Sequence, residues 1–232
     1  MKVGILTFPN SRSYGAALQM YALYHTVNNL GHKAEIINYY NDFMRAEKHF
    51  QPIGSSDLKY FARRIARRLL HARVYEAFEH FEHKNMDMHP RKFFARKENL
   101  FSVGARYDAV ICGSDQVWNP DITGRDVSYF LDFCGEKTRR VSYAPSFGVE
   151  TLPDDFAVQA AEELKKFHAL SAREEQGRKI IADLTGMDVP VVIDPTMLLD
   201  ATQWQRLEEP GFAVNEDSWS IDKKGGTCFL ET

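Results

Sequence analysis

The stretch KVGILTFPNSRSYGAALQMYALYHTVNNLGHKAEIINY, residues 2–39, decides the fold class. Its first part, residues 2–8, is a short apolar run that predicts a buried strand, and a polar loop follows. Residues 14–30 predict a helix, because apolar residues recur at helical spacing and Gly31 is typical of the position after a helix. Residues 34–39 predict a second strand. The stretch is therefore a strand–helix–strand unit, which favours parallel strand pairing.

The rest of the chain continues this alternation. Further strands are predicted at residues 107–112, 139–143, 168–172 and 189–193. Further helices are predicted at residues 57–84, 98–105, 153–167, 174–184 and 201–207, the last capped by Asp200. Residues 40–56 and 85–97 are predicted to be loops. Strands that alternate with helices indicate an α/β fold with a doubly wound, mostly parallel, Rossmann-like sheet.

The pattern also predicts the domain organisation. Residues 1–207 are expected to form one Rossmann-like domain, with a helical insertion at about 57–84. Residues 208–232 contain Pro210-Gly211 and Gly225-Gly226, mixed charges and no apolar period. We therefore expect that segment to be a divergent, poorly packed tail.

Composition and charge narrow the class of protein. Of the 232 residues, 44% are hydrophobic, which is enough to bury a core. The net charge of −3 and the lack of a recognised motif argue against a nucleic-acid partner. The three cysteines, Cys112, Cys134 and Cys228, fit neither a disulfide framework nor a zinc spacing, which favours a reducing cytoplasm. No apolar stretch is long enough to span a bilayer.

The loop GSDQVWN, residues 113–119, follows a predicted strand. In an open parallel sheet, ligands bind at the carboxyl ends of the strands, so this loop is a candidate site. Asp115, Gln116 and Asn119 can hydrogen-bond to hydroxyl groups, and Trp118 offers a flat face to a sugar ring. An Asx-turn with a buried Trp explains the same residues equally well.

A second candidate loop, residues 9–15, leads from the first strand into a helix N-terminus. Exposed N–H groups there can hold an anion or a sugar oxygen. Helix capping by Ser11 or Ser13 is the simpler explanation. With Gly15 as its only glycine, the loop does not match a dinucleotide-binding fingerprint.

Two more loops follow the predicted strands at 168–172 and 189–193. Arg173, beside Glu174 and Glu175, can clamp a carboxylate or a phosphate, although a surface ion pair explains it too. Asp194-Pro195-Thr196 is interpreted as a turn that ends the sheet.

The predicted helix at 57–84 carries two polar features. Its basic face either is solvated or contacts an anionic membrane surface or substrate, and consists of Lys59, Arg63, Arg64, Arg67, Arg68 and Arg73. His80 and His83 have a spacing that can chelate a metal, but no third ligand is evident. No metal site is therefore predicted.

Read together, these loops resemble a known family. The motifs GILTF, SYGAALQMYAL, YDAVICGSDQVWNP, YFLDF, VSYAPSFG, SAREEQG and VIDPTMLLD occur in the order and spacing of the polysaccharide pyruvyl transferases. The resemblance covers residues 1 to about 207. It implies two Rossmann-like domains in a GT-B-like arrangement. It also implies transfer of the enolpyruvyl unit of phosphoenolpyruvate onto a sugar of a cell-surface or exopolysaccharide, which forms a pyruvate ketal and releases phosphate.

The resemblance further implies a site, partners and a location for this chain. Asp115 would be the base, and the substrate-binding residues would be Asn10, Tyr14, Gly15, Ser114, Gln116, Trp118, Asn119, Arg173 and Glu174. Phosphoenolpyruvate would be a co-substrate, with no other cofactor. The acceptor would be a saccharide, often lipid-linked, handled in the cytoplasm at the inner face of the membrane.

The family's second domain is not recognised after residue 207. We therefore expect this chain to keep only the acceptor-side domain. The alternative is a non-catalytic carbohydrate or nucleotide-sugar binding domain left by truncation.

Overall fold

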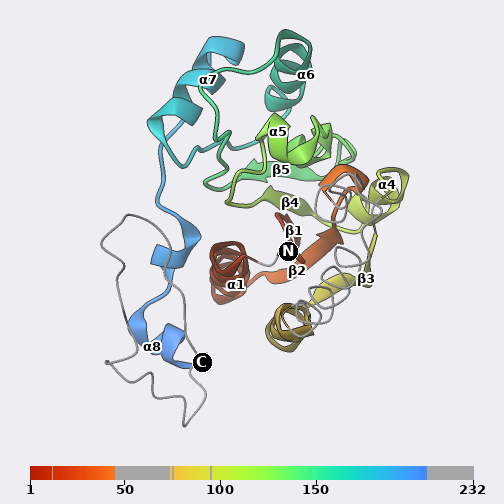
Figure 1. Ribbon diagram of the computed structural model, residues 1–232, viewed down its shortest axis with the longest axis vertical. Coiled ribbons are helices and arrows are strands. Elements are labelled where there is room, and N and C mark those ends of the chain that lie inside the picture. Colours follow the sequence, from red (N-terminus) through yellow and green to blue (C-terminus); the bar gives the residue numbers. More distant parts are fainter. Residues whose placement is uncertain (12, 45–73, 75, 95, 208–232) are drawn as a thin grey trace, which may run out of the picture. The chain divides into compact units, whose positions relative to one another are not determined.

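The computed structural model describes residues 1–11, 13–44, 74, 76–94 and 96–207 (Figure 1). The basic face from Lys59 to Arg73, most of the predicted helical insertion and the predicted tail lie outside the described residues. The chain divides into two compact units, Met1–Leu198 and Leu199–Thr232. The first unit contains the whole sheet. The described part of the second contains helix α8 (Ala201–Gln205).

A five-stranded sheet with the order β3-β2-β1-β4-β5 forms the centre of the first unit. Every pairing in it is parallel. The strands are β1 (Lys2–Leu6), β2 (Lys33–Tyr39), β3 (Met88–Phe94), β4 (Ala109–Cys112) and β5 (Arg139–Ser142). The sheet confirms the predicted α/β Rossmann-like fold. Strand β1 lies in the middle and is buried over most of its length, as its apolar sequence predicts.

Helices cover the two faces of this sheet, with α1 and α4 on opposite sides (Figure 1). The helices of the first unit are α1 (Tyr14–Asn29), residues 76–85, α4 (Glu98–Gly104), α5 (Pro120–Thr123), α6 (Asp154–Leu164) and α7 (Glu175–Thr185). Two short 3₁₀ helices are η1 (Val127–Phe130) and η2 (Pro195–Leu198). The helix ends follow from local chemistry, because the Ser13 side chain caps α1 and Gly31 after it has a φ of +81°.

The predicted loop at residues 85–97 is wrong, because β3 forms there. The sequence of β3, MHPRKFF, is polar and contains Pro90, which is untypical of a buried parallel strand. Strand β3 lies at the edge of the sheet and pairs only with β2. A proline without an N–H and outward polar side chains are tolerated at such an edge.

The strands predicted at 168–172 and 189–193 are reduced to isolated parallel bridges. Val141 pairs with Ala169, and Ala172 pairs with Val191. Pro190 has no N–H group, so its only backbone hydrogen bond in this pairing is the one that its carbonyl accepts from Ala172 N at 3.0 Å. The pairing therefore does not extend into a regular strand, but it still places the residues after Ala172 beside the sheet.

The hydrophobic core beside β4 and β5 is largely aromatic. Trp118 stacks on Phe130 with ring centroids 5.1 Å apart and packs against Phe147, while Phe130 also contacts Phe156. All four side chains are buried. The loop after β4 is therefore anchored in the interior by its Trp.

We expect Gly104→Ala to destabilise the fold although alanine favours helices. A Cβ at Gly104 would lie 2.7 Å from Phe133 Cδ2 and 3.0 Å from the Phe133 carbonyl oxygen. The backbone oxygen cannot move without disturbing the chain, so the free energy of unfolding should fall by about 1–3 kcal/mol in urea denaturation. Gly135→Ala is the control, because a Cβ there meets nothing within 4 Å. Equal stability of the two variants would contradict the tight contact.

Candidate functional site

The loop after β4 places Asp115 in a strained position at the carboxyl end of the sheet. Its φ of 94° lies in the left-handed region, which costs a non-glycine residue on the order of 1 kcal/mol or more. The next loop holds it there, because Asp115 forms a parallel bridge with Pro145 and its carbonyl accepts from Ser146 N at 2.9 Å. The half-buried carboxylate accepts a 2.7 Å bond from Gln116 N. Such strain is typical of residues with a functional role.

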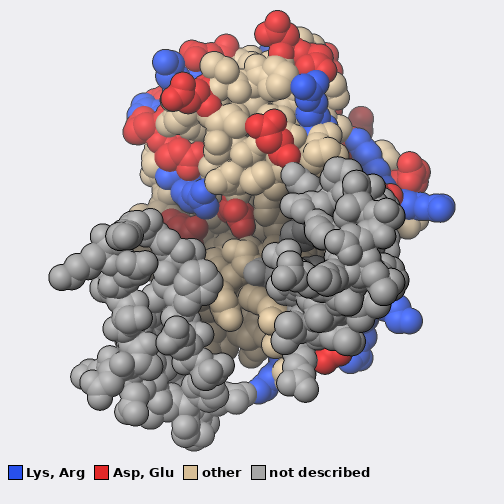
Figure 2. All heavy atoms as spheres, viewed as in Figure 1, with Lys and Arg blue, Asp and Glu red and all other residues tan. Residues whose placement is uncertain are grey.

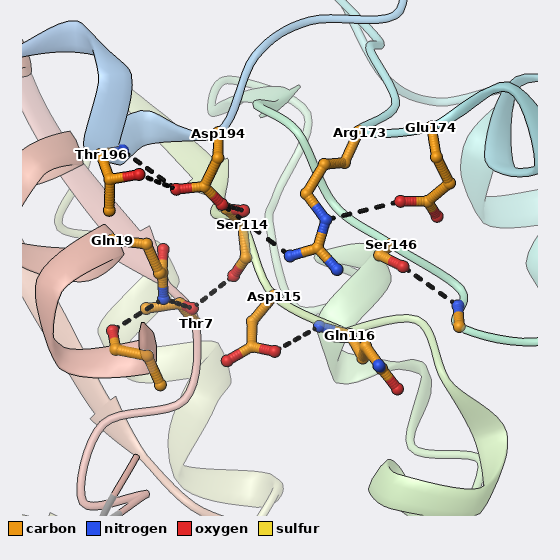
Figure 3. Close-up of polar contacts among 12 residues, drawn as sticks. Thr7, Gln19, Ser114, Asp115, Gln116, Ser146, Arg173, Glu174, Asp194 and Thr196 are labelled. Carbon is orange, nitrogen blue, oxygen red and sulfur yellow. Dashed lines mark hydrogen bonds and ion pairs between the residues drawn. The ribbon is translucent and has the colours of Figure 1, made fainter. Parts of the chain in front are cut away.

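The backbone of Arg173 pairs with the segment around Pro145, as the backbone of Asp115 does. The backbone N–H of Arg173 donates to the Pro145 carbonyl at 3.2 Å. Its guanidinium contacts two carboxylates, through Nε at 3.4 Å from Glu174 Oε2 and through Nη1 at 3.8 Å from Asp194 Oδ2. Backbone pairing on both sides of Pro145 thus brings the predicted base and the predicted anion holder to one end of the sheet (Figure 3).

Asp194 is a site residue that sequence reasoning missed. Its Oδ1 accepts from Thr196 N at 3.0 Å and from Thr196 Oγ1 at 2.8 Å, which is the turn geometry expected from Asp-Pro-Thr. Its Oδ2 also accepts from Ser114 Oγ at 2.9 Å. Asp194 belongs to the motif VIDPTMLLD, which the sequence shows. Nothing in that motif indicates that Asp194 contacts Ser114 and Arg173, which come much earlier in the sequence.

The charge of Asp194 also acts on Tyr143, on the loop after β5. Burial raises the pKa of its phenol, and the negative charge of Asp194 raises it further. The hydroxyl therefore stays protonated at neutral pH and can donate a hydrogen bond. The site thus combines the carboxylates of Asp115, Glu174 and Asp194 with the guanidinium of Arg173, and Tyr143 lies within the influence of the Asp194 charge.

A chain of buried polar groups lies behind these residues (Figure 3). Thr7, directly after β1, donates from Oγ1 to the Ser114 carbonyl at 2.8 Å and accepts from Gln19 Nε2 at 2.9 Å. All three side chains are buried. Gln19 Oε1 has no hydrogen-bond partner among the described residues. The hydrogen bonds from Gln19 through Thr7 to Ser114 connect the loop after β4 to β1 and α1. The back of the site is therefore rigid and polar.

Trp118 and Asn119 do not have the roles predicted for them. Trp118 is 0% exposed and donates from Nε1 to the Tyr129 carbonyl at 2.9 Å, so neither face of its ring is open to a sugar. The buried-Trp alternative describes it correctly. Asn119 is also buried, with Oδ1 capping α5 through Asp121 N at 2.9 Å and Nδ2 bonded to Gln116 Oε1 at 2.8 Å. Both residues shape the loop rather than present polar groups to a ligand.

The residues predicted on the loop between β1 and α1 make their described contacts elsewhere. Asn10 N donates to the two carboxylate oxygens of Glu82 at 2.9 and 3.2 Å, and Asn10 Nδ2 donates to Asn38 Oδ1 at 2.8 Å. Tyr14 is 76% exposed and packs on Phe78 with ring centroids 5.1 Å apart. Gly15 is exposed beside the cap of α1. These contacts fix the loop against β2 and the helix at 76–85, and none of them reaches Asp115.

On the face drawn in Figure 2, the described surface carries charges of both signs. Acidic and basic side chains are interspersed over α6 and α7 (Figure 2). In the described part of the chain, no helix is long and apolar enough to cross a membrane. Among the described residues, the charged groups at the site are Asp115, Glu174 and Asp194, together with Arg173.

The fold and the site define an α/β Rossmann-like domain with a polar site at the carboxyl ends of its parallel strands. The sequence profile of the family described as polysaccharide pyruvyl transferase matches residues 14–227, which is most of the chain. The chain therefore belongs to the polysaccharide pyruvyl transferase family. The matched range extends past residue 207, where the resemblance of the motifs ended. No curated protein and no solved structure matched the chain.

We expect Trp118→Phe to lower stability without weakening saccharide binding by the folded protein. The change removes a buried hydrogen bond and ring volume, so the free energy of unfolding should fall by about 2–4 kcal/mol. Urea denaturation followed by circular dichroism measures this. Trp204→Phe, at a half-buried position in α8, is the control and should have the smaller effect. Normal stability together with weakened saccharide binding would instead restore the stacking role.

Proposed function

We propose that this chain takes part in the transfer of the enolpyruvyl unit of phosphoenolpyruvate onto a saccharide, with formation of a pyruvate ketal and release of phosphate. Membership of the family supports the reaction class and implies a saccharide acceptor. The observation that carries the proposal is the pairing of the Asp115 and Arg173 loops on either side of Pro145. That pairing gives a base candidate and a multiple hydrogen-bond donor at one end of the sheet.

The reaction needs proton transfers that balance. The methylene carbon of phosphoenolpyruvate gains a proton and becomes a methyl group, while the neighbouring carbon forms bonds to two saccharide oxygens. The bond between that carbon and the phosphate oxygen breaks, and phosphate leaves. The two saccharide hydroxyls each lose a proton, so one proton is taken up by carbon and one by phosphate. A base must therefore accept a hydroxyl proton as each new C–O bond forms.

Asp115 suits the role of that base. Its carboxylate is half-buried, so it is accessible to a ligand. The bond from Gln116 N fixes Oδ1 at 2.7 Å and orients the group. A carboxylate held in one orientation by its own loop can accept a proton from a hydroxyl without first reorganising.

The local charges support the acceptor side of the reaction. Phosphoenolpyruvate carries a carboxylate and a phosphate, whereas the charge of Arg173 is already faced by two carboxylates, those of Glu174 and Asp194, which makes this region net negative. Like charges repel, so a neutral saccharide fits here better than an anion. We therefore assign the remaining N–H groups of Arg173 to saccharide oxygens, in place of the anion-holding role expected from its residue type. A lipid-linked acceptor and a cytoplasmic location at the membrane remain predictions from the resemblance.

We expect Asp115→Asn to lower the rate of saccharide-dependent phosphate release by about 10²–10⁴-fold, because the amide cannot take up the hydroxyl proton. The assay measures phosphate released from phosphoenolpyruvate with and without methyl glycosides of the common hexoses, and proton NMR detects the ketal methyl group. Asp121→Asn is the matched control, since it removes an exposed carboxylate from the adjoining helix α5. Its rate should be unchanged.

Three results would change the proposal. Full activity of Asp115→Asn would exclude Asp115 as the base. Saccharide binding by calorimetry without phosphate release from the unsubstituted chain would favour the non-catalytic binding domain. Phosphate release that does not depend on any saccharide would contradict the transfer reaction.

A further inference from the structure

Asp194 connects the loops that form the site. It contacts Ser114 on the loop after β4 and Arg173 on the loop after Ala172, and its charge acts on Tyr143 on the loop after β5. It lies directly before η2, the short helix that starts at Pro195. A single carboxylate thus links segments that are widely separated in the sequence.

The orientation of this carboxylate is determined by hydrogen bonds on both of its oxygens. The N–H and hydroxyl of Thr196 fix Oδ1, and the Ser114 hydroxyl fixes Oδ2. Ser114 is itself fully buried, and its carbonyl accepts from the equally buried Thr7. The Ser114 donor is therefore held within the core, and it keeps Oδ2 on the side of the Arg173 guanidinium, 3.8 Å from Nη1.

The other carboxylate beside Arg173 is less constrained. Glu174 is adjacent in the sequence, has a side chain with one more rotatable bond than Asp194, and its side chain is 37% exposed. Both ion pairs of Arg173 are partly exposed, with the side chain of Asp194 29% exposed, so what distinguishes the two carboxylates is that hydrogen bonds fix both oxygens of Asp194. Asp194 is consequently the carboxylate that can hold the guanidinium in one orientation, although the distance from Arg173 Nη1 to Asp194 Oδ2 is 3.8 Å.

We propose that Asp194 is a positioning residue that orients the Arg173 guanidinium toward the ligand beside Asp115. The guanidinium is a planar fork, so fixing Nη1 determines where the remaining N–H groups point. Ordering this long side chain before the ligand arrives lowers the entropy lost on binding. That Arg173 binds a saccharide rests on the proposed function, whereas the restraint of Arg173 by Asp194 does not depend on it.

We expect Asp194→Asn to release Arg173. The asparagine keeps an acceptor oxygen for Thr196, and its amide can pair with the Ser114 hydroxyl, but the negative charge facing Arg173 is lost. Modification of Arg173 by phenylglyoxal, followed by peptide mass spectrometry, should then become faster by about two- to fivefold, the factor of a typical partly exposed ion pair. The full chain is used, and no activity is required.

The chain offers a matched control. Arg178, on the exposed surface of α7, pairs with Asp188 through Nε at 2.7 Å from Oδ1 and with Glu175 through Nη1 at 3.4 Å from Oε2. Asp188→Asn should accelerate modification of Arg178 and leave Arg173 unchanged. If Arg173 in Asp194→Asn reacts at the original rate while the control responds, Asp194 does not restrain the guanidinium.

A second variant keeps the inference testable if Asp194→Asn does not fold. Ser114→Ala removes the hydroxyl that fixes Oδ2 and leaves the charge of Asp194 in place, so Arg173 should react faster, but less so than without the charge. If the folded Ser114→Ala variant shows an unchanged rate of phenylglyoxal modification at Arg173, the hydrogen bond from Ser114 to Asp194 does not contribute to positioning the guanidinium.

Kinetics separate this inference from the proposed function. In an active chain, Asp194→Asn should raise the KM for the saccharide while the KM for phosphoenolpyruvate stays the same. Absence of phosphate release in every variant would overturn the proposed function, and the arginine reactivity would still decide the role of Asp194. A lower kcat with both KM values unchanged would contradict a role in positioning Arg173 for the saccharide.

Discussion

Parallel backbone pairing of β1, β4 and β5 is the constraint on which the site depends. Leu6 pairs with Cys112, and Cys112 pairs with Ser142, so the three strands end level with one another. The pairing continues beyond the strands through the bridge between Asp115 and Pro145 and the bond from Arg173 N to the Pro145 carbonyl. These contacts involve main-chain atoms only. They therefore position Asp115 and Arg173 whatever side chains these two positions carry.

Burial of Trp118 makes this arrangement rigid. The ring packs among Phe130 and Phe147 and holds the loop after β4 against the core, while Asn119 turns the chain into α5. A loop fixed at both ends can keep Asp115 at a positive φ, because the core packing offsets the local strain. The residues that were expected to touch a ligand thus do something equally necessary, since they hold the neighbouring carboxylate in place.

The sequence could predict the parts of the structure that follow from local patterns. Periodicity and capping located β1, α1 and β2, and the rule that ligands bind at strand ends selected the loops of Asp115 and Arg173. It could not reveal β3, because an edge strand pairs on one side and can be polar. It also could not choose between a stacked sugar and a buried core for Trp118, since an indole suits both. The contacts of Asp194 depend on tertiary distances that a motif does not contain.

The buried polar chain explains how a charged network can lie against an apolar sheet. Burying a carboxylate is costly unless donors satisfy it, and here uncharged hydroxyls and amides supply those donors. Gln19, Thr7 and Ser114 are buried, whereas Asp194 and Arg173 keep part of their surface in water. Neutral groups therefore fix the geometry in the interior, and the charges stay where solvent or a ligand can reach them. This division lets the fold orient Asp194, and through it Arg173, without burying an unpaired charge.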